Sequence, residues 1–230
     1  MITSGIMEIL HKAIQIYDKR CGKEYLIVFG SKNHFEYKFI QIKIKQSYFW
    51  HLLGCRLDAD SNEGKNTTYL NCKNNINVAD KISSVHKFSE IQEKYSAIQN
   101  VFDFVEKAKQ IKVCYAFDCP EEFLFKIGSG NTSGIIGYDY SNNGSTDFLF
   151  PKSAQLKSIS KISKTTYRIF LILSKKIGDK FFNNIEYEIK NDICIELKEF
   201  IPKDVKISQH LFGINETKKN PKVDNKDQEA

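Results

Sequence analysis

The first apolar residues of the chain recur at helical spacing. Ile6, Leu10, Ala13 and Tyr17 fall on one face of a helix, and charged or polar residues occupy most positions between them. Gly22 follows the charged end of this segment, where a glycine commonly ends a helix. The pattern therefore predicts an amphipathic helix of about four turns at the start of the chain.

Two strand patterns follow this helix. Residues 25–29 form a continuous apolar run that ends at Gly30, and residues 35–45 alternate between apolar and polar positions. Two such segments joined by a short turn predict a β-hairpin. The alternation changes phase between Phe39 and Ile40, which indicates a β-bulge at that point.

The middle of the chain changes character twice. Residues 46–54 break the alternation and end in glycine, which suits a short helix or a tight connection. Residues 58–76 are polar and rich in asparagine, so we expect a surface insert there. From residue 77 to residue 109 the apolar positions return to helical spacing, which predicts two helices.

The second half of the chain has a period of two. Short strands are predicted over residues 112–117, 122–127, 133–140, 146–150 and 166–174, with one further pair within 182–198. Glycine and asparagine at 128–131 and 141–144 indicate turns. A helix, a hairpin, further helices and then an antiparallel meander make the fold class α+β.

Length and composition set the domain organisation. The chain has 230 residues, of which 41% are hydrophobic and 27% are charged, and this composition excludes wholesale disorder. We expect a single domain over residues 1–205, which includes the polar insert, and a polar tail without fixed structure over residues 206–230.

The charge balance favours an anionic partner only slightly. Lys and Arg number 34 against 28 acidic residues, which gives a net charge of +6 that permits a nucleic-acid partner without requiring one. No apolar run approaches the roughly 18 residues that cross a bilayer. Glu8 and Lys12 lie inside the first apolar pattern, so a signal peptide is not expected. We therefore expect a cytoplasmic protein with no membrane partner.

Cysteine and motif spacing argue against metal and nucleotide cofactors. None of the six cysteines forms a C-x-x-C pair and no two histidines stand at zinc-ligand spacing, so we expect reduced thiols and no metal site. The glycine motifs of phosphate-binding loops and the H-E-x-x-H motif are absent. We expect no cofactor.

His51 is the first candidate for chemistry. It lies in Tyr-Phe-Trp-His-Leu-Leu-Gly over residues 48–54, directly after a predicted strand. Neighbouring groups can move the pKa of such an imidazole across neutral pH, which suits general acid–base catalysis. The alternative is a core histidine bonded to a backbone carbonyl. The remaining histidines are interpreted as surface or turn residues: His11, His34, His86 and His210.

A second candidate lies where Pro151 is expected to end a strand. Lys152 and Ser153 follow it, and a run of lysines then leads to Tyr167 and Arg168. Cations and hydroxyls at strand ends suit a phosphodiester site, because they can position the phosphate and stabilise its developing charge. The alternative is a solvated loop in a lysine-rich protein.

These two elements, in this order, resemble the PBECR4 group of phage and mobile-element proteins. That group belongs to the barnase, EndoU, colicin E5/D and RelE-like (BECR) nuclease class. The resemblance rests on Phe-Trp-His-Leu-Leu-Gly at 49–54, on Phe-Leu-Phe-Pro-Lys-Ser at 148–153 and on the final strand at 168–175. It covers about residues 5–178, and Lys152 stands where the family often has a small polar residue.

The resemblance implies a fold and a chemistry. The fold is a set of N-terminal helices packed on an antiparallel sheet of at least four strands. The chemistry is metal-independent RNA cleavage, in which the ribose 2′-hydroxyl attacks phosphorus and leaves a 2′,3′-cyclic phosphate. His51 would be the acid–base residue, and Lys152 and Ser153 would contact the phosphate. Arg168, Lys175 and Tyr167 would be supporting phosphate-binding residues.

The implied partners follow from that chemistry. The substrate would be RNA, such as tRNA or mRNA, and a toxin of this kind would have a protein inhibitor or antitoxin. Two other readings stay open. The same fold could be a non-catalytic RNA- or protein-binding module, with exposed aromatic residues and lysines on its strands, or a structural protein of a mobile element.

Overall fold

The computed structural model describes residues 4–31, 36–58, 62–115, 125–140 and 148–212. Its helices are α1 (Ser4–Asp18), α2 (Phe49–Leu53), α3 (Asn62–Lys73), α4 (Phe88–Val101), α5 (Ile159–Ile162) and α6 (Ile193–Glu196). Its strands are β1 (Lys23–Gly30), β2 (Tyr37–Ile44), β3 (Cys55–Leu57), β4 (Ile82–Val85), β5 (Lys112–Tyr115), β6 (Ile127–Gly130), β7 (Ile135–Tyr140), β8 (Phe148–Gln155), β9 (Tyr167–Lys176) and β10 (Asn184–Glu188).

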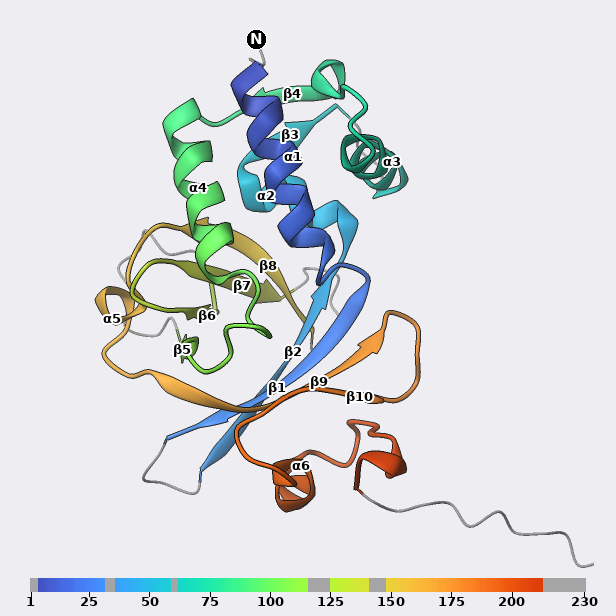
Figure 1. Cartoon of the computed structure of the whole chain (residues 1–230), viewed down its shortest axis with the longest axis vertical. Helices are drawn as coiled ribbons and strands as arrows, with labels where there is room; N and C mark the ends of the chain where they lie inside the picture. The colour runs from blue at the N-terminus through green and yellow to red at the C-terminus, as the bar shows by residue number, and fades with distance from the viewer. Residues whose placement is uncertain (1–3, 32–35, 59–61, 116–124, 141–147, 213–230) are drawn as a thin grey trace, which may run out of the picture.

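A large, mostly antiparallel sheet forms the body of the molecule. Its eight strands run in the order β1-β2-β8-β7-β6-β5-β9-β10, and only the short β2–β8 pairing is parallel. Because β9 also pairs with β1, the strands from β1 to β9 close into a ring and β10 lies outside it. Figure 1 shows α1, α2, α3 and α4 gathered at one end of the sheet and α6 at the other. The expected α+β architecture, with N-terminal helices on an antiparallel sheet, is confirmed.

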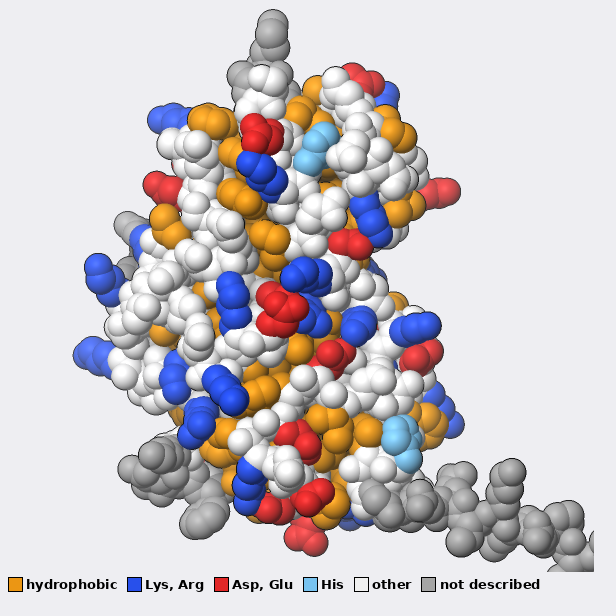
Figure 2. Space-filling model, in the orientation of Figure 1, with side chains coloured by type: hydrophobic (Ala, Val, Ile, Leu, Met, Phe, Trp, Pro, Cys, Tyr) orange, Lys and Arg blue, Asp and Glu red, His pale blue; other side chains and the backbone are white. Residues whose placement is uncertain are grey.

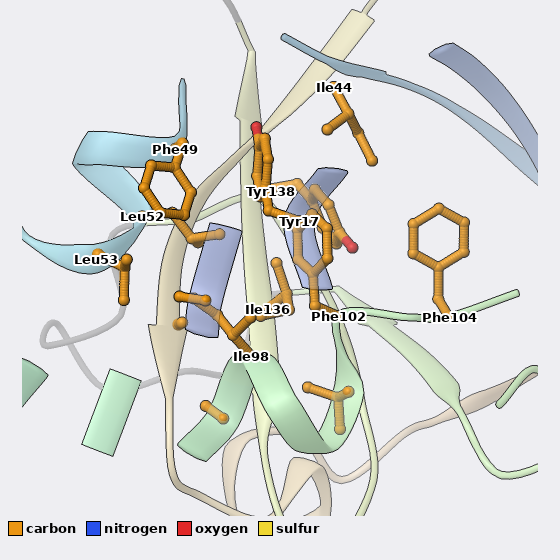
Figure 3. Close-up of a cluster of buried hydrophobic side chains, with 14 of the residues drawn as sticks. Tyr17, Ile44, Phe49, Leu52, Leu53, Ile98, Phe102, Phe104, Ile136 and Tyr138 are labelled. Carbon is orange, nitrogen blue, oxygen red and sulfur yellow. The ribbon is translucent and has the colours of Figure 1, made fainter. Parts of the chain in front are cut away.

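The main hydrophobic core lies between these helices and the sheet. Tyr17 of α1 stacks on Phe102 at a ring-centroid distance of 4.8 Å and meets the edge of Phe49 at 5.3 Å. Figure 3 shows these side chains converging with those of β7, among them Ile136 and Tyr138. The predicted helix at the start of the chain is confirmed, and its apolar face is the face that it buries.

A second hydrophobic cluster covers the opposite face of β1 and β9. Leu26 and Val28 pack there with Leu171 and Leu173, beneath the segment that carries Ile193. Both faces of these two strands are therefore buried, which explains why each reads as a continuous apolar run rather than an alternation.

The β1–β2 hairpin forms as predicted, but the expected bulge between Phe39 and Ile40 is wrong. The register of β2 against β1 is continuous through both residues. Tyr37 lies on the outer face, where it packs against Phe170 of the second cluster and against the exposed Phe200. Tyr37 is therefore packed against the second cluster, whereas Phe39 is 38% exposed and Phe35 lies outside the described residues.

The expected turn at residues 128–131 is also wrong, because Gly128 and Gly130 lie within β6. A Cβ atom on Gly130 would collide with the backbone carbonyl of Gly134, in the turn directly before β7. The glycine at 130 is thus required by close approach of two backbones and not by a turn conformation. The expected turn at 141–144 lies outside the described residues.

Three further segments differ from expectation. The polar insert contains helix α3, which buries Tyr69 and Cys72 against the core. Residues 77–109 form strand β4 and a single helix, α4, instead of two helices. Residues 182–198 supply one strand, β10, and then α6. Helix α3 and the short elements β4, β10 and α6 bury at most three side chains each, so the sequence carries little periodic signal for them.

The polar tail begins later than expected. Residue 207 bridges to Phe182, and Leu211 and Phe212 pack against the second cluster, so 206–212 belong to the folded body. The rest of the expected tail lies outside the described residues. Within the part of the chain that the structure describes, no helix is both long and apolar enough to cross a membrane.

Candidate active site

Helix α2 presents His51 at the surface. Leu52 and Leu53, the last two residues of the helix, are buried in the core, whereas His51 is exposed. Gly54 ends the helix in the left-handed conformation, at φ 76°, and its N–H donates to the carbonyl oxygen of His51 over 3.0 Å. The reading of His51 as a buried core histidine is therefore wrong.

Gly54 also places a second histidine. The N–H of His86, which follows β4, donates to the carbonyl oxygen of Gly54 over 3.1 Å. The His86 ring lies so close that a Cβ on Gly54 would stand 2.8 Å from it. On its other side, His86 Nδ1 lies 2.7 Å from Oε2 of Glu90 in α4. The glycine of the H-L-x-G element thus caps one histidine's helix and provides room for the other histidine.

Strand β8 supplies Lys152 and Ser153 opposite these histidines. The strand does not end at Pro151, as expected, but continues to Gln155. Its register against β7 shifts beside Pro151, so Lys152 is the extra residue of a bulge. A bulge tolerates the missing N–H of proline and turns side chains out of the regular alternation. Lys152 Nζ lies 2.6 Å from Oδ2 of Asp139 on β7.

These side chains line one pocket of about 580 Å³. It lies between α2, β3, β4, α4 and β8, which are distant in sequence. Its lining consists of His51, Gly54, Cys55, Arg56, Ser84, His86, Lys94, Lys152, Ser153 and Gln155. A neighbouring pocket of about 370 Å³ shares His51 and Arg56 and adds Lys65. The structure therefore brings together the three predicted catalytic residues, His51, Lys152 and Ser153.

The pocket is electropositive, and this changes its titrating groups. Partial desolvation lowers the pKa of His51, and the positive charges of Lys94 and Lys152 lower it further. Burial likewise lowers the pKa of Lys94. Among the described residues, no carboxylate lies within ion-pair distance of Lys94 or Arg56. A neutral imidazole beside cations suits proton abstraction next to a bound phosphate.

The three predicted supporting residues do not reach this pocket. Tyr167, Arg168 and Lys175 lie on β9, which pairs with β1, β5 and β10, whereas the pocket borders β8. Lys175 is paired with buried Glu24 over 3.1 Å, and Tyr167 lies under Lys38 with 5.0 Å from Nζ to the ring centroid. Their place in the fold supports structural roles in the sheet.

Sequence reasoning missed His86 and Lys94. His86 stands in polar sequence and looks like a surface residue until its contact with Gly54 is seen. The sequence does contain one signal, because His86, Glu90 and Lys94 are spaced by four residues. This spacing places Glu90 and Lys94 on one face of α4, with His86 at the start of that face.

The cysteines and possible metal ligands complete the site. Cys55, which lines the pocket, is a free thiol, and burial raises its pKa to about 12. In the ranges that the structure covers, no group of three or more His, Cys, Asp or Glu side chains could hold a metal ion. His34 and Cys119 lie outside those ranges.

Comparison with known proteins supports a nuclease. Residues 9–191 match the family described as phage-Barnase-EndoU-ColicinE5/D-RelE like nuclease4, PBECR4. Neither the comparison with curated proteins nor that with solved structures gave a match. The match spans most of the chain and includes every residue that lines the pocket. The chain therefore belongs to the PBECR4 family of BECR-type nucleases.

Proposed function

We propose that this nuclease cleaves RNA without a metal ion, by attack of the ribose 2′-hydroxyl on the adjacent phosphorus. The observation that carries the proposal is the convergence of His51, His86, Lys94, Lys152 and Ser153 on one pocket. This set supplies a base, an acid and cations from side chains alone, which is what 2′,3′-cyclic phosphate formation requires.

His51 is the general base of the proposed reaction. Its lowered pKa keeps the imidazole neutral near pH 7, so the ring can accept the proton of the 2′-hydroxyl. The 2′-oxygen then bonds to phosphorus as the bond from phosphorus to the 5′-oxygen breaks. Because His51 is exposed at the mouth of the pocket, an RNA strand can reach it.

His86 is the general acid that protonates the departing 5′-oxygen. Its Nδ1 faces the Glu90 carboxylate at 2.7 Å, which fixes the ring and leaves Nε2 as the nitrogen available to a ligand. The acid and the base thus lie on either side of Gly54, and one proton is taken up by His51 as another leaves His86.

The cations stabilise the phosphate as its negative charge increases. Lys94 and Arg56 have no carboxylate partner among the described residues, so a phosphate would be their counter-ion. Lys152 is held in place by Asp139, and the Ser153 hydroxyl lies beside it to position a phosphate oxygen. Each of these groups acts on charge that develops during the reaction.

The proposed biological setting follows from the family. We infer an origin in a phage or mobile element and a toxic action on cellular RNA such as tRNA or mRNA in the cytoplasm, restrained by a protein inhibitor. An active ribonuclease should stunt the host that expresses it and select for mutations at His51 or Lys152. Quiet expression of the wild type would favour the non-catalytic binding module.

The test is cleavage of total RNA by purified protein in EDTA. Wild type should leave 2′,3′-cyclic phosphate ends, and His51→Ala and His86→Ala should each lower the rate by about 10²- to 10⁴-fold, because each removes one proton-transfer group. His210→Ala is the matched control, because His210 is exposed outside the pocket. This variant should cleave RNA at the wild-type rate. Cleavage that survives both pocket substitutions would overturn the assignment, and a folded wild type that cleaves no RNA would overturn the proposed activity.

A further inference from the structure

Three aromatic side chains on β8 and in the turn before α2 are close in sequence to the pocket residues Lys152 and His51. On β8, Leu149 and Pro151 are buried, whereas Phe148 and Phe150 point to the other face and are half-buried. Tyr48, in the turn before α2, stacks beside Phe150 with ring centroids 4.9 Å apart and planes at 33°. We name Tyr48, Phe148 and Phe150 the aromatic strip.

The core does not account for the aromatic strip. None of its three residues belongs to the hydrophobic clusters of the described chain, or to the partly buried side chains packed against them. Half-exposed rings that the core does not use suggest a binding surface, because water contact with an aromatic face is costly.

Cations accompany the rings. Lys45, which is exposed, has its Nζ 5.9 Å from the centroid of Tyr48, and Lys43, which also pairs with Glu24, has its Nζ 4.2 Å from that of Phe148. Aromatic faces interleaved with cations are the surface that binds single-stranded nucleic acid, where bases stack on the rings and the cations attract the backbone.

The geometry continues into the pocket. Residues two apart on a strand are separated by about 6.6 Å, a spacing comparable to that of neighbouring nucleotides in an extended strand. Phe148 and Phe150 are spaced in this way on β8, and Lys152 follows at the bulge after Pro151, so a strand whose bases stack on the rings reaches the pocket at Lys152.

We propose that the aromatic strip binds the unpaired bases next to the cleaved phosphate and so restricts this enzyme to single-stranded RNA. The inference rests on the proposed function for the identity of the nucleic acid. In a duplex the bases stack on one another inside the helix and cannot reach the rings. Stacking tolerates every base, so the strip selects single strands and not a particular sequence.

The test measures binding apart from cleavage. The probe is a short fluorescent RNA that is 2′-O-methylated throughout, so that it has no 2′-hydroxyl nucleophile, used as a single strand and as a duplex with its complement. Phe148→Leu and Phe150→Leu keep apolar volume and remove the flat ring. Phe181→Leu is the matched control, because Phe181 is 43% exposed outside the strip and also has a lysine over its ring.

Each strip substitution should weaken binding of the single strand by roughly tenfold, and Phe181→Leu should leave it unchanged. The duplex should bind more weakly than the single strand and should not respond to either strip substitution. Wild-type affinity in both strip variants, or a duplex that binds as tightly as the single strand, would overturn the inference.

A folding control and a cleavage assay complete the design. If a leucine variant has a lowered midpoint of thermal unfolding, Phe150→Trp is used in its place. The single strand should quench the tryptophan fluorescence of this variant, and an absence of quenching would count against the strip. Tight single-strand binding without cleavage in EDTA would keep the strip and reject the ribonuclease. Cleavage of single strands at the wild-type rate by both leucine variants would keep the ribonuclease and reject the strip.

Discussion

At the scale of single residues, Gly54 explains why the His-Leu-Leu-Gly element has this form. The left-handed conformation at φ 76° ends α2 immediately after His51, and the missing side chain admits the ring of His86. Two separate requirements therefore fall on one glycine. The histidine of the element is visible in the sequence, but the histidine that it meets comes from more than thirty residues later and only folding brings them together.

The pKa of His51 should be visible in the pH profile of cleavage. In kcat/KM the acidic limb reports the base of the free enzyme, so the limb should lie below the ordinary histidine value of about 6.5. The charge of Lys94 disfavours the protonated ring. Lys94→Gln should therefore raise the pKa of His51 and move the limb to higher pH, as profiles of kcat/KM would show.

The overall rate of Lys94→Gln should also fall, since Lys94 is proposed to bind the phosphate, but only the position of the limb tests the pKa. Lys81→Gln is the control, because Lys81 is an exposed cation paired with Asp80. An NMR titration of the His51 ring should show the same upward shift. A limb that stays in place in Lys94→Gln would show that Lys94 does not set the charge state of His51.

At the scale of elements, the sequence predicts those whose burial follows one regular pattern. Helix α1 and strand β2 each bury one face with a clear period, and β1 is a continuous apolar run buried on both faces, so all three are predicted correctly. Helix α3 was not predicted, because only Thr68, Tyr69 and Cys72 of its polar sequence are buried. Strand β6 was not predicted, because its glycines are typical of a turn. In the structure, the close approach of neighbouring atoms requires these glycines.

The residues of the proposed site also differ in how far the sequence alone predicts them. His51, Lys152 and Ser153 could be singled out from local sequence, the His-Leu-Leu-Gly element and the Phe-Pro-Lys-Ser segment. His86 and Lys94 could not, because only contacts between β4, α4 and α2, which no local pattern records, bring them to the pocket. Arg168 and Lys175 were misplaced since residue type alone does not tell which strands become neighbours in the sheet.

A buried ion pair holds the ends of α1 and α4 together, and its loss should destabilise the fold. Arg20 Nε donates to Asp103 Oδ1 over 2.8 Å, and both residues are buried. Asp103→Asn removes the nearest counter-charge of the guanidinium and leaves it only Glu106 and Glu186, at 3.8 and 3.9 Å, so the free energy of unfolding should fall by about 3 kcal/mol. Urea unfolding followed by circular dichroism measures this change.

Glu8→Gln is the control for that experiment. It breaks an exposed pair with Lys12 on α1 and should leave the urea midpoint where it is. The double variant Arg20→Met with Asp103→Leu removes both charges and should be more stable than Asp103→Asn alone. A single variant as stable as wild type would mean that Glu106 and Glu186 suffice as counter-charges and that the pair with Asp103 does not hold the helices.

At the scale of the whole molecule, the net charge of +6 says little about where RNA binds. Figure 2 shows basic and acidic side chains mixed over the visible face. Several lysines are neutralised within the fold, such as Lys43 and Lys175 by Glu24. The pocket is different because Arg56 and Lys94 lack a carboxylate partner in the described chain. We therefore expect binding to depend on local charge.

Salt dependence distinguishes local charge from net charge. For single strands, the slope of log affinity against log salt concentration changes by about 0.7 for each phosphate contact. The double variant Arg56→Gln with Lys94→Gln should make the slope shallower by about 1.4, because two such contacts are lost. Lys180→Gln with Lys203→Gln removes the same charge from exposed positions outside the pocket and should keep the wild-type slope. Titrations of the 2′-O-methylated single strand at several salt concentrations measure both slopes. If the slope becomes shallower by the same amount in both double variants, the overall positive charge attracts the RNA and the pocket holds no phosphate of its own. If the slope becomes shallower only in the pocket variant, the RNA backbone lies at Arg56 and Lys94, beside His51.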